Sequence, residues 1–380
     1  MSLILLIVGV ALIIGLIISH EFGHFLVARK NGVEVEEFGI FFPPRLYSRQ
    51  TKDGWVFSIN LLPLGGFVKL KGEHDSDTEP GTFGATNLGT KAKILLAGVT
   101  VNLITGLILF TLLALIGMPK LLSNQYTYKD NTKLIAQKVM VNDVVTGSPA
   151  AKAGLKVGDQ LTELSLPNNK KVSFVTSAND MRSITKKYAN QVVDIHYLDN
   201  GQAFIKQVRF LPRSSSYQLG VATQQLNLYR STWSAPIVAL GLGGQLIWAT
   251  IIGLGHSLAG LGSIIAGIVT HNDVARHNGQ TAAVANLTGP VGIYAILYSS
   301  SAMGYQFVLF IVAYISLVLA FMNILPIPIV DGGRLYLTLI SRFLKRPISA
   351  KREEAINMVS IVLLLLLFVL ITIADVKRYY

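Results

Sequence analysis

The sequence predicts a polytopic α-helical membrane protein with one soluble α+β domain inserted between its helices. Two observations on composition support this. Of the 380 residues, 51% are hydrophobic and only 14% are charged, whereas a soluble domain carries about 25% charged residues. A third observation is a more polar region between residues 133 and 221, which separates long apolar stretches. A disordered chain and a purely soluble enzyme are therefore disfavoured.

Four apolar stretches are long enough to cross a bilayer, which takes about 20 residues. They are residues 2–28, 94–117, 306–325 and 358–374. The first stretch has the alternative of a cleaved signal peptide. It has no basic region after Met1, however, and its apolar run continues past any plausible cleavage site, so we favour a span.

Basic residues set the expected orientation of these spans. The loop from Arg29 to Lys93 contains nine Lys and Arg residues, and the loop from Arg342 to Arg352 contains five. Both loops are expected in the cytoplasm, which leaves both termini and the segment 119–305 outside. The formal net charge of +12 is thus interpreted as orienting loops, and no nucleic-acid partner is expected.

One further segment, residues 235–270, is apolar but contains eight glycines. It has three interpretations: a span, a re-entrant segment or a helix in the membrane interface. A single crossing would put the ends of the first and third spans on opposite sides of the membrane. The motifs below need those ends on one side, so we favour a membrane-associated segment that does not span.

The polar region reads as a small α+β domain. The stretches "QKVMVNDVV" and "QVVDIHYL" alternate as strands do, and "GSPAAKAGLKVGDQL" between them predicts a turn, a short helix and a second turn. That string resembles the signature of PDZ domains in bacterial proteases, which bind extended peptides at a sheet edge. The later "YQLGV", residues 217–221, is either a loop for a peptide carboxylate or an ordinary turn. The domain is expected to bind peptide or to act as a size filter.

A metal-binding pattern ends the first apolar stretch. In "SHEFGHFLVARK", His20, Glu21 and His24 form an HExxH motif, and residues four apart share one helix face. Both imidazoles then reach one ion, with Glu21 placed to take a proton from its water. The alternative without a metal is a pair of helix-end histidines that flank a glutamate by chance. The chain has no cysteine, so a metal site must use histidine and carboxylate ligands.

The third ligand must come from elsewhere in the chain. Its candidates are several carboxylates and the remaining histidines His74, His256, His271 and His277. Asp331 in "NILPIPIVDGGRL" is favoured, because it follows the third span at the expected depth of the histidines. Pro326 and Pro328 disrupt a helix there, and non-helical backbone at membrane depth must line protein or a water-filled cavity. The alternative is a kinked helix that Asp331 caps.

Together these motifs resemble the site-2 protease family of intramembrane zinc metalloproteases, and within it the bacterial RseP type with a single PDZ domain. The shared elements follow one another over nearly the whole chain. They are HEFGH at 20–24, "EFGIFFPPRLYS", "LPLGGFVKLKGE" at 62–73, the second span, the PDZ signature, "LTGPVGIY" at 287–294 and NxxPxPxxDGG at 323–333. Val330 replaces the leucine that is usual in the family.

The resemblance implies roles for particular residues. His20, His24 and Asp331 correspond to the family's zinc ligands and Glu21 to its catalytic glutamate. The stretch "LPLGGFVKL" resembles a membrane-reentrant β-hairpin that pairs with an unwound substrate, with an ordinary cytoplasmic hairpin as the alternative. Positions that correspond to substrate handling are Asn323, Pro326, Pro328, Gly65, Gly66 and Phe67.

The expected architecture is a polytopic α-helical membrane protein of about four transmembrane helices, with a membrane-reentrant β-hairpin and an inserted extracytoplasmic PDZ-like α+β domain. Its parts are an N-terminal membrane domain at 1–118, the PDZ-like domain at 130–222, a membrane-associated helical segment at 230–300 and a C-terminal membrane domain at 301–380. The implied location is a bacterial plasma membrane, with the active site near the cytoplasmic side.

The implied function is zinc-dependent cleavage of single-span membrane proteins within the bilayer, in regulated intramembrane proteolysis. The implied substrates are an anti-sigma factor or a remnant signal peptide, with the lipid bilayer as a further partner. Two rivals belong to other classes. A membrane-anchored PDZ scaffold needs no metal, and a transporter needs more spans with polar residues distributed through several of them.

Overall fold

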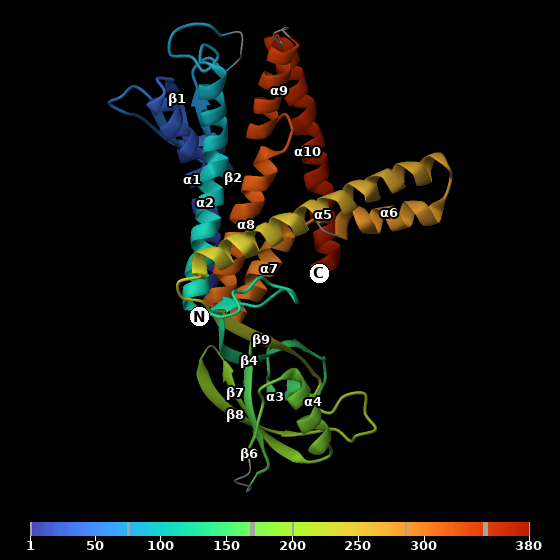
Figure 1. Cartoon of the computed structure of the whole chain (residues 1–380). Helices are drawn as coiled ribbons and strands as arrows, with labels where there is room; N and C mark the ends of the chain where they lie inside the picture. Colours follow the sequence, from blue (N-terminus) through green and yellow to red (C-terminus); the bar gives the residue numbers. More distant parts are fainter. Residues whose placement is uncertain are drawn as a thin grey trace. The chain divides into compact units, whose positions relative to one another are not determined.

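A computed structural model describes residues 2–73, 77–167, 172–199, 201–285, 287–344 and 349–379. His74, one of the candidate ligands, lies outside these residues. The helices in the described part of the chain are α1 (Ser2–Lys30), α2 (Leu88–Ile116), α3 (Pro149–Ala153), α4 (Ala178–Lys187), α5 (Ala235–Val269), α6 (Asp273–Ala285), α7 (Pro290–Met303), α8 (Tyr305–Ile324), α9 (Asp331–Phe343) and α10 (Ala350–Tyr379) (Figure 1).

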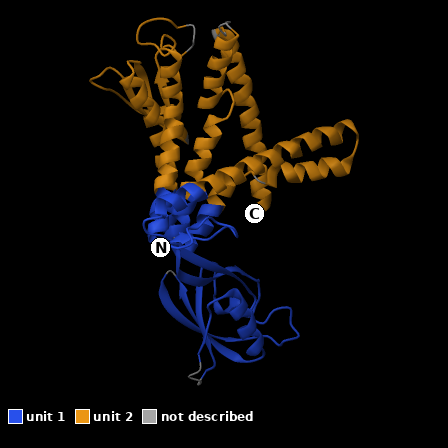
Figure 2. Cartoon of the chain, viewed as in Figure 1, with its two compact units in different colours: residues 1–9, 109–242, 296–311 blue, residues 10–108, 243–295, 312–380 orange. Residues whose placement is uncertain are grey.

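The strands form two sheets. They are β1 (Val35–Gln50), β2 (Val56–Leu70), β3 (Met118–Pro119), β4 (Lys133–Val144), β5 (Gln160–Ser165), β6 (Val172–Phe174), β7 (Val192–Asp199), β8 (Gln202–Arg209) and β9 (Val221–Arg230). The chain divides into two compact units (Figure 2). Unit 1 comprises residues 1–9, 109–242 and 296–311, and unit 2 comprises residues 10–108, 243–295 and 312–380.

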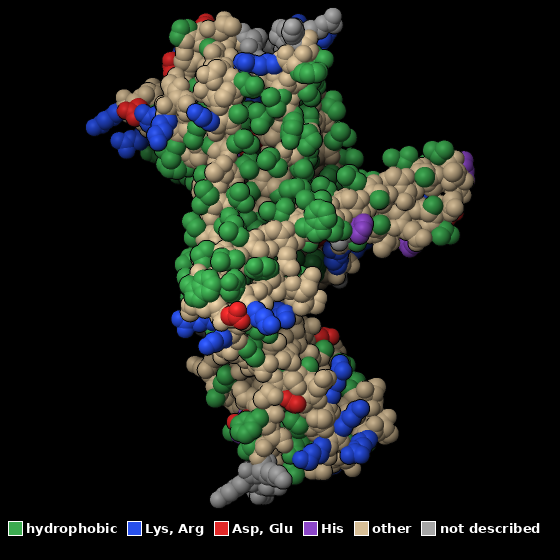
Figure 3. All heavy atoms as spheres, viewed as in Figure 1, with side chains coloured by type: hydrophobic (Ala, Val, Ile, Leu, Met, Phe, Trp, Pro, Cys, Tyr) green, Lys and Arg blue, Asp and Glu red, His purple; other side chains and the backbone are tan. Residues whose placement is uncertain are grey.

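Five helices of the described chain are long and apolar enough to cross a membrane: α1, α2, α5, α8 and α10. Four of them coincide with the four predicted stretches, and α5 is an additional one. The helices α6 and α7 pass the same test together, as a pair bent by 54°. Figure 3 shows hydrophobic side chains over the helical part of unit 2, as expected of a surface that faces lipid.

The helices α5 and α6 form a tightly packed antiparallel hairpin within unit 2 (Figure 1). A Cβ atom on Gly260 would collide with the backbone nitrogen of Ala283, and one on Gly279 would lie 2.7 Å from the backbone nitrogen of Ile264. Glycines on both helices thus let the two backbones touch, as small residues do between membrane helices. At 35 residues, α5 is long enough to cross a membrane.

The larger sheet lies in unit 1. Its strand order is β3-β9-β4-β5-β7-β8, with β6 paired to β5. The two stretches predicted as strands lie in β4 and β7, and the predicted short helix is α3. Ser148 caps α3 by accepting from the Ala151 N–H, and Gly154 ends it in the left-handed conformation. Buried Val139, Leu164 and Ile195 are part of the core beneath the sheet.

The smaller sheet lies in unit 2 and is larger than the predicted hairpin. Residues 35–40 pair with 66–70, and residues 45–50 pair with 56–60. Residues 37–40 also pair with 56–59, so two bent strands contribute four segments to one sheet. The adjacent glycines Gly65 and Gly66 suit the turn of a hairpin in the sequence, but both lie within β2, so a turn at that point is wrong. Among the described pairings, residues 66–70 have neighbours on one side only.

The glycine contacts of α5 generate a prediction. Gly260→Ala should lower the thermal unfolding temperature in detergent, because overpacking against a backbone costs about 1–3 kcal/mol and Cβ meets the Ala283 backbone. Gly262→Ala is the matched control, since its Cβ would meet nothing within 4 Å. It should raise stability by up to about 1 kcal/mol through helix propensity. Equal stabilisation by both variants would contradict the packed hairpin.

Candidate metal centre

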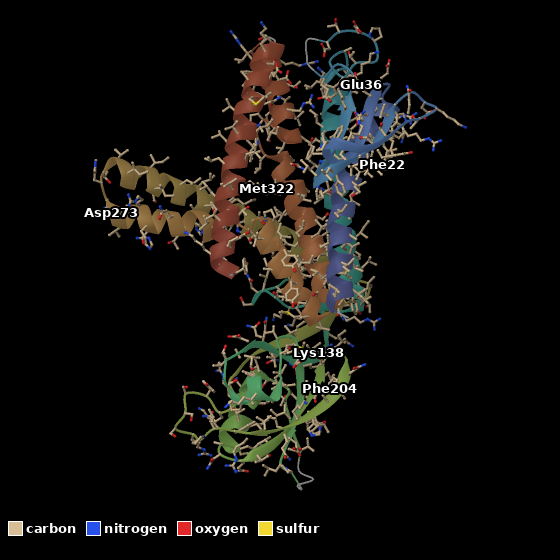
Figure 4. All side chains as sticks on the ribbon, turned by 180° about the vertical axis from the view of Figure 1, so that it is seen from behind. Phe22, Glu36, Lys138, Phe204, Asp273 and Met322 are labelled. Atoms are coloured by element: carbon tan, nitrogen blue, oxygen red, sulfur yellow. The ribbon has the colours of Figure 1, made fainter. Side chains whose placement is uncertain are left out.

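Two histidines project from one face of α1. The helix runs without interruption through 29 residues, so His20 and His24 lie one turn apart on the same side. Both are buried, each 7% exposed. Their Nε2 atoms are 3.2 Å apart, so the two rings converge on a single point. Phe22, next to Glu21 in the chain, marks this level of α1 in Figure 4.

Asp331 reaches the histidines from the other end of the chain. Helix α8 ends at Ile324, two residues before Pro326, and α9 begins at Asp331. The intervening residues fold back so closely that a Cβ on Gly332 or Gly333 would collide with backbone atoms of residues 324–328. The glycines thus allow a close turn that places a carboxylate beside α1. Met322, near the end of α8, is labelled in Figure 4.

The three potential ligand atoms form a nearly equilateral triangle. Oδ2 of Asp331 lies 3.1 Å from Nε2 of His20 and 3.2 Å from Nε2 of His24, which matches the 3.2 Å between the nitrogens. Tetrahedral zinc with bonds of 2.0–2.1 Å separates its ligand atoms by about 3.3 Å. This is the one His, Asp and Glu group of metal-binding geometry within the described residues.

Space for an ion is provided by helix α2. A Cβ on Gly98 would lie 2.5 Å from Nε2 of His24 and 2.6 Å from Nε2 of His20. Any side chain at position 98 would therefore fill the space beside the two Nε2 atoms. Oδ2 of Asp331 is also buried without a hydrogen-bond partner among the described residues. An orphaned carboxylate oxygen facing two imidazoles and an open cradle fits a bound divalent cation.

The charge state of Asp331 suits a ligand. Burial raises the pKa of its carboxyl, but the adjacent imidazoles of His20 and His24 outweigh burial and hold the pKa well below its usual range. The carboxylate is therefore ionised at neutral pH, as metal binding requires. His24 is oriented by its other ring nitrogen, since Nδ1 lies 2.7 Å from the backbone oxygen of Ile94. A carbonyl only accepts, so this contact leaves Nε2 free to bind.

Glu21 faces the smaller sheet. A Cβ on Gly66 would lie 3.1 Å from Cγ of Glu21, so the glutamate of the HExxH motif packs against the strand segment of residues 66–70. This arrangement places a carboxylate, the candidate metal centre and a strand edge next to one another.

The other sequence candidates divide into two groups. Nδ2 of Asn323 lies 3.3 Å from Nε2 of His20, so the structure brings Asn323 to the centre. Gly65 packs against Phe42, and the Phe67 ring stacks on the same Phe42 at 6.3 Å. Pro326 and Pro328 lie in the turn before Asp331. The alternative ligands His256, His271 and His277 are not in the group with His20 and His24.

Two residues of the site escaped the sequence analysis. Gly98 provides the cradle, and Asn102 lies with Nδ2 3.2 Å from Nδ1 of His20. Both belong to the second apolar stretch, where a glycine and an asparagine four residues apart share one helix face. An amide within an apolar span was the available signal, because polar groups at membrane depth are usually functional.

Comparison with known proteins agrees with this geometry. A model of peptidase family M50 matches residues 8–367. A putative zinc metalloprotease of Clostridium perfringens is 28% identical over 362 residues, which cover 95% of each chain. The zinc metalloprotease RasP of Shouchella clausii is 25% identical, and the probable protease eep of Enterococcus faecalis is 24% identical. Each of these two alignments covers 96% of this chain and 97% of the relative.

The cradle at Gly98 generates a prediction. Gly98→Ala should abolish stoichiometric zinc binding, because the added methyl group enters the space between the two Nε2 atoms. Zinc content of the purified protein by mass spectrometry measures this. Gly15→Ala in α1 is the control, since its Cβ would meet nothing within 4 Å and zinc should stay bound. Full zinc occupancy in Gly98→Ala would contradict the position assigned to the ion.

Proposed function

The chain belongs to peptidase family M50 and is a metallopeptidase with several membrane helices, and from this premise we propose that it cleaves single-span membrane proteins within or near the bilayer. The observation that carries the proposal is the triangle of His20, His24 and Asp331, with all three edges at 3.1–3.2 Å. His20 and His24 lie on α1, which is long and apolar enough to cross a membrane, beside Glu21 and the strand of residues 66–70. Ionisable groups at membrane depth are usually functional.

The proposed cofactor is zinc, held by the three atoms of that triangle. Two imidazoles and one carboxylate with a fourth position left open are the donor set of catalytic zinc sites. The relatives from Clostridium perfringens and Shouchella clausii are named zinc metalloproteases. When bound, the ion supplies Lewis-acid polarisation of the scissile carbonyl and an acidified water.

The proposed chemistry assigns the proton transfers to Glu21. Its carboxylate takes a proton from the attacking water and later delivers it to the leaving amine. Gly66 packs against the Glu21 side chain and so limits its position. Asn323 lies beside His20 and is placed to donate its Nδ2–H to a substrate carbonyl oxygen. Burial of the histidines, each 7% exposed, excludes bulk water from the centre.

We assign substrate alignment to residues 66–70. A transmembrane helix shields its peptide bonds in internal hydrogen bonds, so the substrate must unwind before attack. The outer side of this strand has no paired strand among the described residues, so an extended segment can be added there, as in strand addition. Gly65, Gly66 and Phe67 lead into the edge, and Gly66 packs against Glu21. Pro326 and Pro328 line the return of the chain to Asp331.

Unit 1 is proposed to contain a PDZ-like domain over residues 130–222. The capped helix α3 and the turn at Gly158, with φ of +95°, support this assignment. Gly220 packs against Ser148 at the start of α3, which brings "YQLG" to the helix as a carboxylate loop requires. The domain would bind or filter substrates already shortened outside the cell, and both termini would share that side of a bacterial plasma membrane.

The proposed pathway is regulated intramembrane proteolysis, with anti-sigma factors and remnant signal peptides as the two candidate substrates. Membership of a peptidase family disfavours the scaffold and the transporter. The proposed parts of the chain are membrane domains at 1–118 and 301–380 and a membrane-associated segment at 230–300.

The role of Glu21 is testable with purified protein. Glu21→Gln should keep bound zinc and lose at least 100-fold in cleavage rate, because a general base contributes about 10²–10⁴. The substrate panel contains truncated single-span anti-sigma factors and signal-peptide remnants, with products read by mass spectrometry. His24→Ala is the companion variant and should lose zinc and cleavage together. Wild-type cleavage rates in Glu21→Gln would remove Glu21 from the mechanism.

Asn323 should separate substrate handling from metal binding. Asn323→Leu is expected to keep zinc and to lower kcat/KM roughly fivefold, since one neutral hydrogen bond is worth about 1 kcal/mol. Kinetics on a fluorogenic single-span substrate measure the change. Loss of zinc in this variant would instead make Asn323 part of the metal centre.

A further inference from the structure

We propose that Asn102 is a positioning residue that holds the His20 ring in its metal-binding tautomer, by accepting the Nδ1–H proton on its side-chain oxygen. The inference rests on the metal site of the proposed function and deepens it. Asn102 lies on α2 and is 1% exposed, in a helix otherwise rich in apolar residues. An amide buried to this degree costs stability unless it is hydrogen-bonded.

The side chain of Asn102 contacts His20, and its backbone is anchored from a second helix. Its Nδ2 atom lies 3.2 Å from Nδ1 of His20. The backbone oxygen of Asn102 accepts from the hydroxyl of Ser316 on α8 at 2.7 Å, and Ser316 is fully buried. Asn102 therefore joins α1, α2 and α8 at the level of the ligands. Its Oδ1 atom is buried with no partner among the described residues.

Ligand chemistry decides which atom of the amide must face the ring. A neutral imidazole that binds metal through Nε2 carries its proton on Nδ1, so its partner there must accept. Oδ1 accepts and Nδ2 only donates. A half-turn of the amide exchanges the two atoms and brings the unpartnered oxygen onto Nδ1. Either orientation makes one hydrogen bond to the ring, so the proton on His20 selects between them.

Helix α2 places a hydrogen-bonding group beside Nδ1 of each histidine. The Ile94 carbonyl lies 2.7 Å from Nδ1 of His24, and the Asn102 amide meets the same atom of His20. Gly98 lies between them and leaves the space beside both Nε2 atoms. Positions 94, 98 and 102 are four apart and share one face. On that face the Ile94 carbonyl and, in the proposed orientation, the Asn102 side-chain oxygen accept from the two histidines. Gly98 leaves the space between them.

The test measures zinc affinity by chelator competition on the full chain in detergent. Asn102→Leu, which has nearly the same shape but no acceptor, should bind zinc 10–100-fold more weakly, the usual loss for an outer partner of a metal ligand. Asn102→Asp should stay within a few-fold of wild type, because a carboxylate accepts from Nδ1–H. The visible spectrum of the cobalt-loaded proteins reports ligand geometry independently of cleavage.

Ser316→Ala is the control for packing. It removes the hydroxyl that contacts the Asn102 backbone and leaves the amide in place, so it should lower the unfolding temperature and keep zinc affinity. Asn102→Ala replaces the leucine variant if that protein does not fold. Wild-type affinity in the apolar variant overturns the proposal, as does equal loss in Asn102→Asp. Absence of zinc binding by the wild type refutes the metal site itself.

Discussion

The proposed metal centre depends on bringing three candidate ligand atoms within 3.2 Å of one another inside a membrane protein. Two of these atoms belong to one turn of α1, so the main structural requirement falls on the elements that surround that turn. Helix α2 must lie close enough for a backbone carbonyl to meet one imidazole. Glycines make this possible on both helices, because a Cβ on Gly23 would lie 3.1 Å from the Ala97 oxygen and one on Gly98 would enter the site. Small residues here serve chemistry as well as helix packing.

The third ligand imposes a different constraint, since it lies where a helix has been broken. Free backbone groups are costly at membrane depth unless protein surrounds them. Hydrogen bonds satisfy backbone groups within the break. Ile327 N–H donates to the Leu325 oxygen and Val330 N–H to the Ile327 oxygen. Arg334 then fixes α9 by donating to the side chain and the backbone oxygen of Glu73, at the end of the smaller sheet. The segment that carries Asp331 is thereby tied to the strand edge that Glu21 faces.

Sequence patterns identified the candidate ligands but not the residues that surround them. His20, Glu21 and His24 follow from spacing along one helix, and Asp331 follows from the order of spans and from two prolines. Gly98 and Asn102 were missed because their roles depend on which helix lies opposite. Spacing along one chain segment does not contain that information. The smaller sheet was underestimated for a similar reason, since residues 37–40 pair with two separate segments of β2. Such pairing is non-local and leaves no periodic signature.

Helices α1 and α8 bring His20 and Asn323 to the same level. His20 lies 18 residues after the first residue of α1, and Asn323 lies 18 residues after the first residue of α8. At 1.5 Å per residue both are about 27 Å along their helices. Near their starts the two helices touch, because a Cβ on Gly9 would lie 3.0 Å from Val308. Two helices that begin together and run the same way bring position 18 of each to one level. If α1, α2 and α8 all cross a membrane, residues 235–303 begin and end on the side where α1 and α8 begin. Helix α6, with 13 residues, runs antiparallel to the 35-residue α5 and so begins this return of the chain.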